Sequence, residues 1–369
     1  MRIEQIRLNH LRMMLQSPFE TSFGSIDTRD SLLIEVIADG ITGYGECVAD
    51  YHPGYSYETT GTAWHILENF IIPVLKGRKI EHPNDFYNLI MDIKGHQMAK
   101  AGIEMALWDL YGKMMDKSMK ELLGGVYDRV PVGVSIGIKP SPEVLVEEVS
   151  RYLEKGYQRI KLKIKPGRDV VETEMVRKVY PDLALQVDAN SAYTLKTAKK
   201  LKSLDELNLL LIEQPLAEDD LWDHHRLQAD LETPICLDES ILCLRHVRQA
   251  IEMQAGRIIN IKAGRVGGLI PAVSIHDYCQ EHEIPVWCGG MLETGVGRAA
   301  NLALASLPNF SLPGDISASE RYYKNDITNE LFTLNEDSTI NVPDSSGLGV
   351  SINQEELSKV TIKKKTLRL

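Results

Sequence analysis

Hydrophobic and polar positions follow one rhythm near the N-terminus and another in the middle of the chain. In the first fifty residues, three segments alternate or run apolar at strand length: 3–8, 32–37 and 42–47. The pair Asp39-Gly40 lies between the last two segments and is typical of a tight turn that joins antiparallel strands. These positions predict an antiparallel sheet at the start of the chain.

A helical pattern follows this sheet. In the segment 98–115, apolar residues recur at intervals of three and four and predict one buried helix face: Ile103, Leu107, Leu110 and Met114. Two leucines before Gly124-Gly125 indicate a helix that ends at a glycine stop. We therefore expect an α+β domain over residues 1–125.

From residue 131 the rhythm changes to short apolar runs, each followed by a helical stretch of about a dozen residues. Seven such runs occur in order: VGVSIGI, RIKLKI, ALQVDAN, LLLIEQP, PICLDES, RIINIKAG and PVWCGG. Strands that alternate with helices pair in parallel, and so many consecutive units favour a closed barrel over an open sheet. We expect the barrel to occupy residues 126–320, with residues 321–369 packing back onto the first domain.

Charged residues stand at the ends of five successive runs, at steps of 25, 25, 25 and 24 residues: Lys163, Asp188, Glu213, Asp238 and Lys262. The carboxyl ends of barrel strands meet at one rim, where active sites are built. Three neighbouring carboxylates would repel one another unless a cation lay between them. Oxygen ligands of this kind suit Mg²⁺, so the pattern predicts a magnesium site at this rim.

The two lysines flank the predicted metal site on either side. A metal that binds a substrate carboxylate stabilises the enediolate formed when the α-proton leaves, and a nearby amine can take that proton. Two amines on opposite faces could racemise the substrate, and one alone could drive elimination. Lys161 points the same way as Lys163 because side chains alternate along a strand.

Each of these residues also has a purely structural interpretation. The segment 238–240 would cap a helix well, and Lys161, Lys163 and Lys165 alternate with apolar residues as an exposed strand face would. For any one of these residues alone, we would favour the structural interpretation. Five charged residues in phase on five consecutive units favour a catalytic site instead.

Composition narrows the class of protein. The 369 residues carry 41 basic and 52 acidic side chains, a net charge of −11, and no long basic cluster, which argues against nucleic-acid binding. No apolar run is long enough to span a bilayer, and the first residues do not read as a secretory signal. Five scattered cysteines without a CxxC pair fit reduced thiols. We expect a soluble cytoplasmic protein without a membrane partner.

Several motifs together resemble the o-succinylbenzoate synthase and N-acylamino acid racemase family of the enolase superfamily. They are KLK at 161–163, VDAN at 187–190, IEQP at 212–215, CLDES at 236–240, NIKAGRVGG at 260–268 and GGMLETGVGRAANLALASLP at 289–308. The resemblance covers nearly the whole chain. It implies an α/β fold: a TIM-like (β/α)7β barrel with an α+β capping domain built from the N-terminal region and the C-terminal tail.

The resemblance also assigns roles to individual residues. It implies that Lys163 and Lys262 form the acid/base pair and that Arg265 lowers the pKa of Lys262. Asp188, Glu213 and Asp238 would ligate Mg²⁺, for which Mn²⁺ or Co²⁺ could substitute. The substrate site would include Ser135, Lys161, Asn190, Met291 and Leu292. Loops around 19–24 and 50–55 would close over the substrate and exclude water.

The activity implied for this family is twofold. Its synthases dehydrate 2-succinyl-6-hydroxy-2,4-cyclohexadiene-1-carboxylate in menaquinone biosynthesis, with Lys163 as the base and Lys262 as a cation. Its racemases exchange the α-proton of N-succinyl amino acids with both lysines. We expect a synthase with racemase activity, acting on a small-molecule carboxylate as a homo-oligomer. A dedicated N-acylamino acid racemase, or a barrel that binds an anionic metabolite without catalysis, remains as an alternative.

Overall fold

The computed structural model describes residues 1–369 and contains a four-stranded antiparallel sheet in the order β13-β1-β2-β3. Its strands are β1 (Gln5–Thr21), β2 (Gly24–Ala38), β3 (Ile41–Cys47) and β13 (Thr361–Arg368). Asp39 and Gly40 form the turn between β2 and β3, both with positive φ, at 50° and 74°. The predicted hairpin is confirmed, although β1 and β2 are much longer than the predicted apolar segments.

One long helix packs directly on this sheet. The helices of this part are α1 (Thr60–Ile66), the π-helical turn η1 (Leu67–Ile71), α2 (Ile72–Leu75), α3 (Asp85–Leu89), α4 (Gln97–Met115) and α5 (Met119–Leu123). Strand β3 lies so close to α4 that a Cβ atom at Gly45 would be 2.1 Å from the carbonyl oxygen of Gly102. Fourteen of the nineteen residues of α4 are buried, so more than the single predicted face is covered.

Seven parallel strands form the second sheet, in sequence order from β5 to β11. They are β5 (Val134–Ile136), β6 (Arg159–Lys163), β7 (Ala184–Asp188), β8 (Ile212–Glu213), β9 (Ile235–Leu237), β10 (Ile258–Ile261) and β11 (Val286–Cys288). Every residue of β5, β9, β10 and β11 is buried. Strands covered on both faces read as continuous apolar runs, which explains the pattern in the sequence.

An irregular eighth segment, residues 310–315, closes the sheet into a barrel. Phe310 pairs in parallel with Val286 of β11, and Gly314 pairs in parallel with Val132, just before β5. The backbone N–H of Asp315 also donates to the carbonyl of Cys288, at 2.9 Å. The fold is therefore the expected (β/α)7β barrel, with this segment as its last strand.

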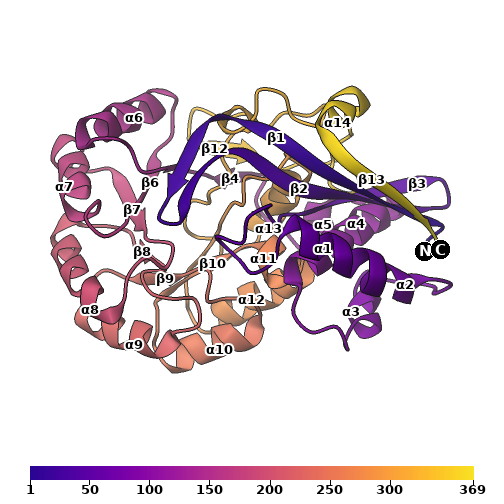
Figure 1. The fold of residues 1–369 in the computed structure, drawn as a ribbon, viewed down its shortest axis with the longest axis horizontal. Coiled ribbons are helices and arrows are strands. Elements are labelled where there is room, and N and C mark those ends of the chain that lie inside the picture. Colours follow the sequence, from indigo (N-terminus) through magenta and orange to yellow (C-terminus); the bar gives the residue numbers. More distant parts are fainter.

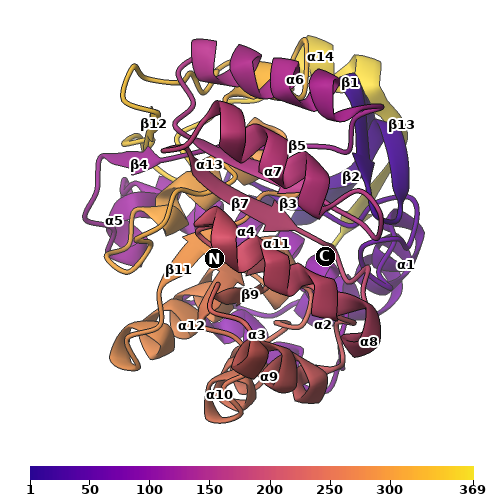
Figure 2. The same cartoon turned by 90° about the vertical axis from the view of Figure 1, so that its left-hand side faces the viewer.

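Helices cover the outer face of the barrel, as Figures 1 and 2 show. They are α6 (Pro142–Glu154), α7 (Val170–Val179), α8 (Leu195–Ala198) with the 3₁₀ helix η2 (Lys199–Leu207), α9 (Leu221–Asp230), α10 (Leu244–Glu252), α12 (Leu269–Glu281) and α13 (Gly295–Ala305). The short α11 (Ala263–Val266) instead follows Lys262 at the rim and packs against α4. Capping residues mark the start of several of these helices. The Ser141 side chain accepts from the backbone N–H of Val144 and Pro142 follows at the first position of α6.

The C-terminal tail touches both parts of the molecule. Its elements are the 3₁₀ turn η3 (Ser319–Arg321), β12 (Thr339–Asn341), α14 (Gln354–Val360) and β13. Strand β12 pairs with β4 (Arg129–Pro131), whereas β13 joins β1 in the N-terminal sheet. Figure 1 shows the yellow tail beside the indigo strands, where the expectation placed it. None of the helices is both long and apolar enough to cross a lipid bilayer.

Candidate active site

The five charged residues predicted from the sequence all lie at one rim of the barrel. Lys163, Asp188 and Glu213 are the last residues of β6, β7 and β8 and are direct neighbours in the strand register. Asp238 and Lys262 follow β9 and β10 directly. Counted around the eight strand positions, β6 and β10 are four apart, so the two lysines stand on opposite sides of the barrel.

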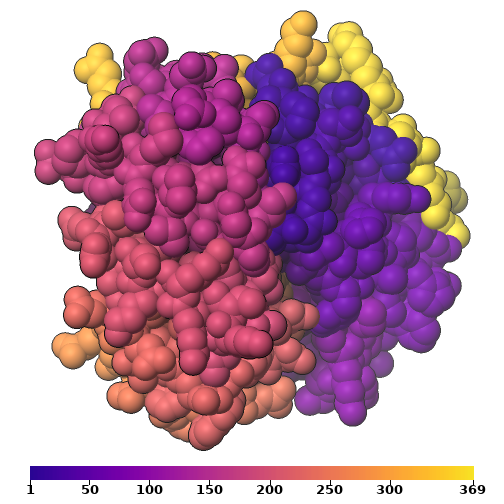
Figure 3. Space-filling view, turned by 60° about the vertical axis from the view of Figure 1, so that its left-hand side comes forward, coloured from indigo at the N-terminus to yellow at the C-terminus, as the bar shows by residue number.

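A cavity of about 390 Å³ opens at this rim. Lys161, Lys163 and Lys262 line it from the barrel side, together with Ser135, Asn190, Met291 and Leu292. The other wall comes from the N-terminal part, whose contributions include Phe19, Phe23, His52 and Tyr55. Figure 3 shows the indigo N-terminal residues lying directly against the barrel. The two loops expected to cover a substrate therefore border the cavity.

Lys163 is held by two oxygen acceptors. Its Nζ donates to Asp188 Oδ2 and to Asn190 Oδ1, both at 2.6 Å. Asn190 adopts a positive φ of 42° and donates from its amide to Glu239 Oε1 at 2.9 Å. The second oxygen of Glu239 is buried without a hydrogen-bond partner. Asn190 thus connects the candidate base to a carboxylate that the sequence pattern did not single out.

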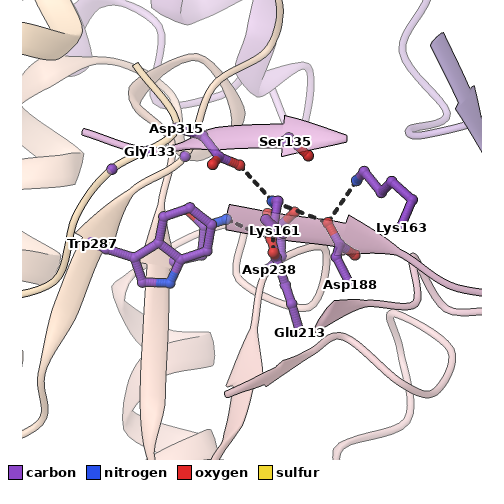
Figure 4. Close-up of polar contacts among 12 residues, drawn as sticks. Gly133, Ser135, Lys161, Lys163, Asp188, Glu213, Asp238, Trp287 and Asp315 are labelled. Atoms are coloured by element: carbon purple, nitrogen blue, oxygen red, sulfur yellow. Dashed lines mark hydrogen bonds and ion pairs between the residues drawn. The ribbon is translucent and has the colours of Figure 1, made fainter. Parts of the chain in front are cut away.

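Lys161 lies deeper and contacts three carboxylates. Its Nζ is 2.5 Å from Asp315 Oδ2, 2.7 Å from Glu213 Oε2 and 3.1 Å from Asp188 Oδ2. Figure 4 shows the Lys161 ammonium between these side chains, with Asp188 shared between Lys161 and Lys163. The two lysines of β6 therefore point to the same rim, as the alternation along the strand predicts.

The Lys262 side of the cavity is built differently. Its Nζ donates to Asp238 Oδ2 at 2.7 Å and to the Tyr55 hydroxyl at 3.0 Å. The same hydroxyl donates to Asp238 Oδ1, also at 3.0 Å. Arg265 forms an ion pair with Asp238 and donates to the Tyr55 hydroxyl at 3.3 Å. A loop of the N-terminal part thereby places a hydroxyl against the second candidate acid/base residue.

Burial and neighbouring charges shift the pKa values in this cluster. Burial raises the pKa of Asp188, but the ammonium groups of Lys163 and Lys161 outweigh it and hold that pKa below its ordinary value. Burial, joined by the charge of Asp188, raises the pKa of Glu213. Burial lowers the pKa of Lys262, but the facing Tyr55 and the nearby carboxylates outweigh it and raise that pKa, so the net shift is opposite to the lowering expected from Arg265. Among the protein groups alone, Lys262 therefore stays protonated at neutral pH.

The donor set fits a hard divalent cation. Asp188, Glu213 and Asp238 are each at most 1% exposed and offer carboxylate oxygens from neighbouring strand ends. In the structure each of them bonds a lysine, and no three His, Cys, Asp or Glu side chains are grouped at metal-binding spacing. The pKa of Glu213 is raised by burial and by repulsion from Asp188, and a divalent cation would offset that repulsion.

The contacts of these residues do not support a purely structural interpretation. Helix α10 starts at Leu244 with Cys243 as its N-cap, so residues 238–240 do not cap it. Lys161 is 2% exposed and does not lie on a solvated strand face. The contacts of Tyr55, Glu239 and Asp315 were not expected from the sequence. Only the positions of two of them in the sequence could have pointed to the site: Glu239 follows Asp238, and Tyr55 lies in a loop expected to cover the substrate.

Two family models together match most of the chain. The model described as mandelate racemase / muconate lactonizing enzyme, N-terminal domain, matches residues 3–124. The model described as enolase C-terminal domain-like matches residues 144–357. Both belong to the enolase superfamily, in agreement with the barrel and the antiparallel sheet beside it.

Relatives of known name cover the chain from end to end. An o-succinylbenzoate synthase of Geobacillus kaustophilus is 49% identical over 97% of this chain and 96% of its own. An N-succinylamino acid racemase of an Amycolatopsis species is 48% identical over 99% of both chains. The crystal structure of an enolase superfamily member from Listeria innocua superposes with a TM-score of 0.96 at 43% identity, covering 100% of this chain and 99% of the other. With both halves matched and full-length relatives near 49% identity, the chain belongs to the enolase superfamily, in the family of o-succinylbenzoate synthases and N-succinylamino acid racemases.

Proposed function

We propose that this protein is a divalent-metal-dependent o-succinylbenzoate synthase that also racemises N-succinyl amino acids. The observation that carries the proposal is the pair of lysines on opposite sides of one cavity, with buried carboxylates at the strand ends between them. Relatives named for each of the two reactions, at 49% and 48% identity, support both activities.

In the dehydration, Lys163 acts as the base from its place beside Asp188 and Asn190. Its neutral amine takes the proton from the carbon that bears the substrate carboxylate. The C–O bond to the ring hydroxyl then breaks on the same face, the Lys163 ammonium returns its proton to the departing hydroxide, and water leaves as the ring becomes aromatic. Lys262, protonated between Asp238 and Tyr55, remains a cation and stabilises the negative charge that develops on the substrate carboxylate.

In the racemisation both lysines exchange protons. One amine removes the α-proton of an N-succinyl amino acid from one face, and the opposite ammonium delivers a proton to the other face. A divalent cation held by Asp188, Glu213 and Asp238, with Mg²⁺ the first choice, would supply positive charge to the substrate carboxylate during both reactions. Ser135, Lys161, Asn190, Met291 and Leu292 border the substrate, and Arg265 acts through Asp238 and Tyr55 on Lys262.

We also propose different roles for the two domains. We assign the capping domain to residues 1–125, completed by 321–369, and the catalytic barrel to 126–320. The cap contributes loops that exclude water from the cavity, and the barrel contributes the acid/base and metal-binding groups. A cytoplasmic location, a homo-oligomeric state and the absence of nucleic-acid and membrane partners stay predictions.

A dedicated racemase is the second candidate, because the two lysines on opposite faces suit proton exchange as well as elimination. One experiment separates the possibilities. The protein is incubated with Mg²⁺ in D₂O, first with N-succinyl amino acids and then with the cyclohexadiene carboxylate, and both are followed by proton NMR. Dehydration together with α-deuteration supports the proposal, and deuteration alone supports the dedicated racemase. If neither reaction is observed, the protein is a non-catalytic barrel and the proposal is overturned.

A further inference from the structure

Lys161 has a third carboxylate partner that lies outside the predicted metal set. The Lys161 ammonium forms ion pairs with Asp315, Glu213 and Asp188, and it also donates a hydrogen bond to Glu213. Asp188 and Glu213 come from β7 and β8, on one side of β6. Asp315 comes from the closing segment, on the other side of β6 beyond β5. Figure 4 shows the Asp315 carboxylate in contact with the ammonium of Lys161, which is carried by β6.

Asp315 is fixed independently of Lys161. Its Oδ1 accepts from the guanidinium of Arg159 at 2.7 Å, and Arg159 also donates to the carbonyls of Pro313 and Gly314, at 2.9 and 2.6 Å. Both side chains of the Arg159–Asp315 pair are buried. Burial raises the pKa of Asp315, but Lys161 and Arg159 outweigh it and lower that pKa to about 2. The carboxylate is therefore charged at neutral pH, and Arg159 holds it in place.

The surroundings leave space for this pair of ions and little else. A Cβ atom at Gly133 would lie 2.4 Å from the Arg159 guanidinium, and one at Gly290 would lie 2.7 Å from the Asp315 carbonyl oxygen. The Trp287 ring covers the other side, with its centre 4.8 Å from Lys161 Nζ. The two glycines thus leave room for Arg159 and for the Asp315 backbone, and the indole covers Lys161, whose other two carboxylate partners are proposed metal ligands.

We infer that Asp315 is a positioning residue that serves as the dedicated counter-ion of Lys161 and so leaves Asp188 and Glu213 available to a divalent cation. This inference rests on the proposed metal site. Without Asp315, the Lys161 ammonium would keep only Asp188 and Glu213 as charged partners. It would then compete with the metal for their oxygens. With Asp315 in place, Lys161 retains a full ion pair when the other two carboxylates bind metal.

The test measures metal binding and not turnover. Mg²⁺ is titrated calorimetrically into the metal-free native protein and into Asp315→Asn, Lys161→Met and the double variant. We expect Asp315→Asn to raise the Kd for Mg²⁺ by about tenfold, the size of coupling found between directly contacting charged groups. In the Lys161→Met background the same substitution should change Kd by less than about twofold, because no ammonium remains to compete. A purely structural role would weaken binding equally in both backgrounds and would overturn the inference, as would no weakening at all.

Two further measurements keep the result decisive. If Asp315→Asn does not fold, Asp315→Glu replaces it, because it keeps the charge but moves it. Its Kd must then rise in the native background and stay unchanged in Lys161→Met, or the inference is wrong. A native protein that binds no Mg²⁺ at millimolar concentration would refute the metal site of the proposed function. Native binding with equal losses in both backgrounds would refute the role of Asp315 alone.

Discussion

At the scale of single residues, the two candidate acid/base lysines have different partners. Lys163 bonds a carboxylate and an amide oxygen, whereas Lys262 bonds a carboxylate and a phenol hydroxyl. Lys262 also shares Asp238 with Arg265. The partners of Lys262 raise its pKa among the protein groups, which suits the cationic role proposed for it in dehydration.

Alanine variants of the two lysines should separate their roles. Lys163→Ala should lower the dehydration rate by about 10²- to 10⁴-fold, the contribution expected of a positioned base. Lys262→Ala should lower dehydration less but abolish racemisation. In D₂O each variant should deuterate only one enantiomer of an N-succinyl amino acid, and the two variants should differ in which. Proton NMR on each pure enantiomer measures the loss of its α-proton signal as deuterium is incorporated.

Lys196→Ala is the matched control, since Lys196 is an exposed lysine on α8. It should leave both reactions at the native rate. Deuteration of both enantiomers by both lysine variants would contradict the assignment of one lysine to each face.

The charged residues at the strand ends could be predicted because their spacing repeats with the βα unit. Asp315 gave no such signal: it follows Pro313 and Gly314 in a segment without strand alternation, and its partners lie about 155 residues away in the sequence. Tyr55 was within an expected loop, but its contact with Lys262 depends on how two parts of the chain dock. Single-sequence patterns report local periodicity and carry little information on such contacts.

At the scale of elements, buried carboxylates join the N-terminal part to helices of the barrel. Glu104 of α4 accepts from the backbone N–H groups of Leu269 and Ile270, the first residues of α12, at 2.8 and 3.0 Å. Glu46 of β3 accepts in the same way from Thr294 and Gly297 at the start of α13. A carboxylate at a helix N-terminus satisfies donors that have no partner within the helix.

Glu104 should make stability depend on pH. Burial raises its pKa from 4.5 to about 7 despite the hydrogen bonds it accepts. The folded state therefore binds more protons than the unfolded state between these values. The stability contributed by protonated Glu104 is complete below pH 4.5 and is lost as the pH rises through 7. The loss for a shift of this size is at most about 3 kcal/mol.

Urea unfolding at pH 5 and pH 8 measures this loss. Glu104→Gln, which does not titrate, should lose less free energy of unfolding between the two pH values than the native protein. Glu206→Gln changes an exposed carboxylate and serves as the control, with the native pH dependence. An identical pH dependence for Glu104→Gln would show that Glu104 does not titrate in this range.

The elements themselves divide into those with and those without a local pattern. The seven barrel strands and helix α4 could be predicted because buried strands and helices have regular apolar spacing. Strand β1 extends to Thr21, beyond its apolar segment, because pairing with β2 and not burial holds its outer half. The closing segment 310–315 could not be predicted as a strand, since it contains Pro313 and Gly314 and joins its neighbours through single bridges.

At the scale of the whole molecule, residues distant in sequence meet at the cavity. The barrel supplies the lysines and carboxylates, and the N-terminal part supplies the covering wall, with Ser22 Oγ donating to the carbonyl of Asn190 at 3.1 Å. The C-terminal tail joins the N-terminal sheet through β13, which pairs with β1. The expectation that the tail returns to the first domain holds for β13, while β12 pairs with β4 beside the barrel instead. The loss of strand rhythm in the tail indicated a return but not its route.

Metal binding should stabilise the molecule as a whole, because its ligands come from strands that are assembled only in the folded state. With free Mg²⁺ at a hundred times its Kd, the free energy of unfolding should rise by about 2.7 kcal/mol over the metal-free protein. Thermal unfolding with and without Mg²⁺ measures this rise as an increase in Tm. Asp188→Asn, which removes the charge of one proposed ligand, should show a much smaller increase.

Chelation tests the same site through catalysis. Excess EDTA should abolish both dehydration and racemisation, because the developing charge on the substrate carboxylate would lose the divalent cation that offsets it. Readdition of Mg²⁺ should restore both activities together, since both reactions use the same carboxylates at the ends of β7, β8 and β9. Turnover that persists in EDTA, or an equal Mg²⁺-induced rise in Tm for Asp188→Asn and the native protein, would contradict the assignment. The buried carboxylates would then serve only as partners of Lys161, Lys163 and Lys262.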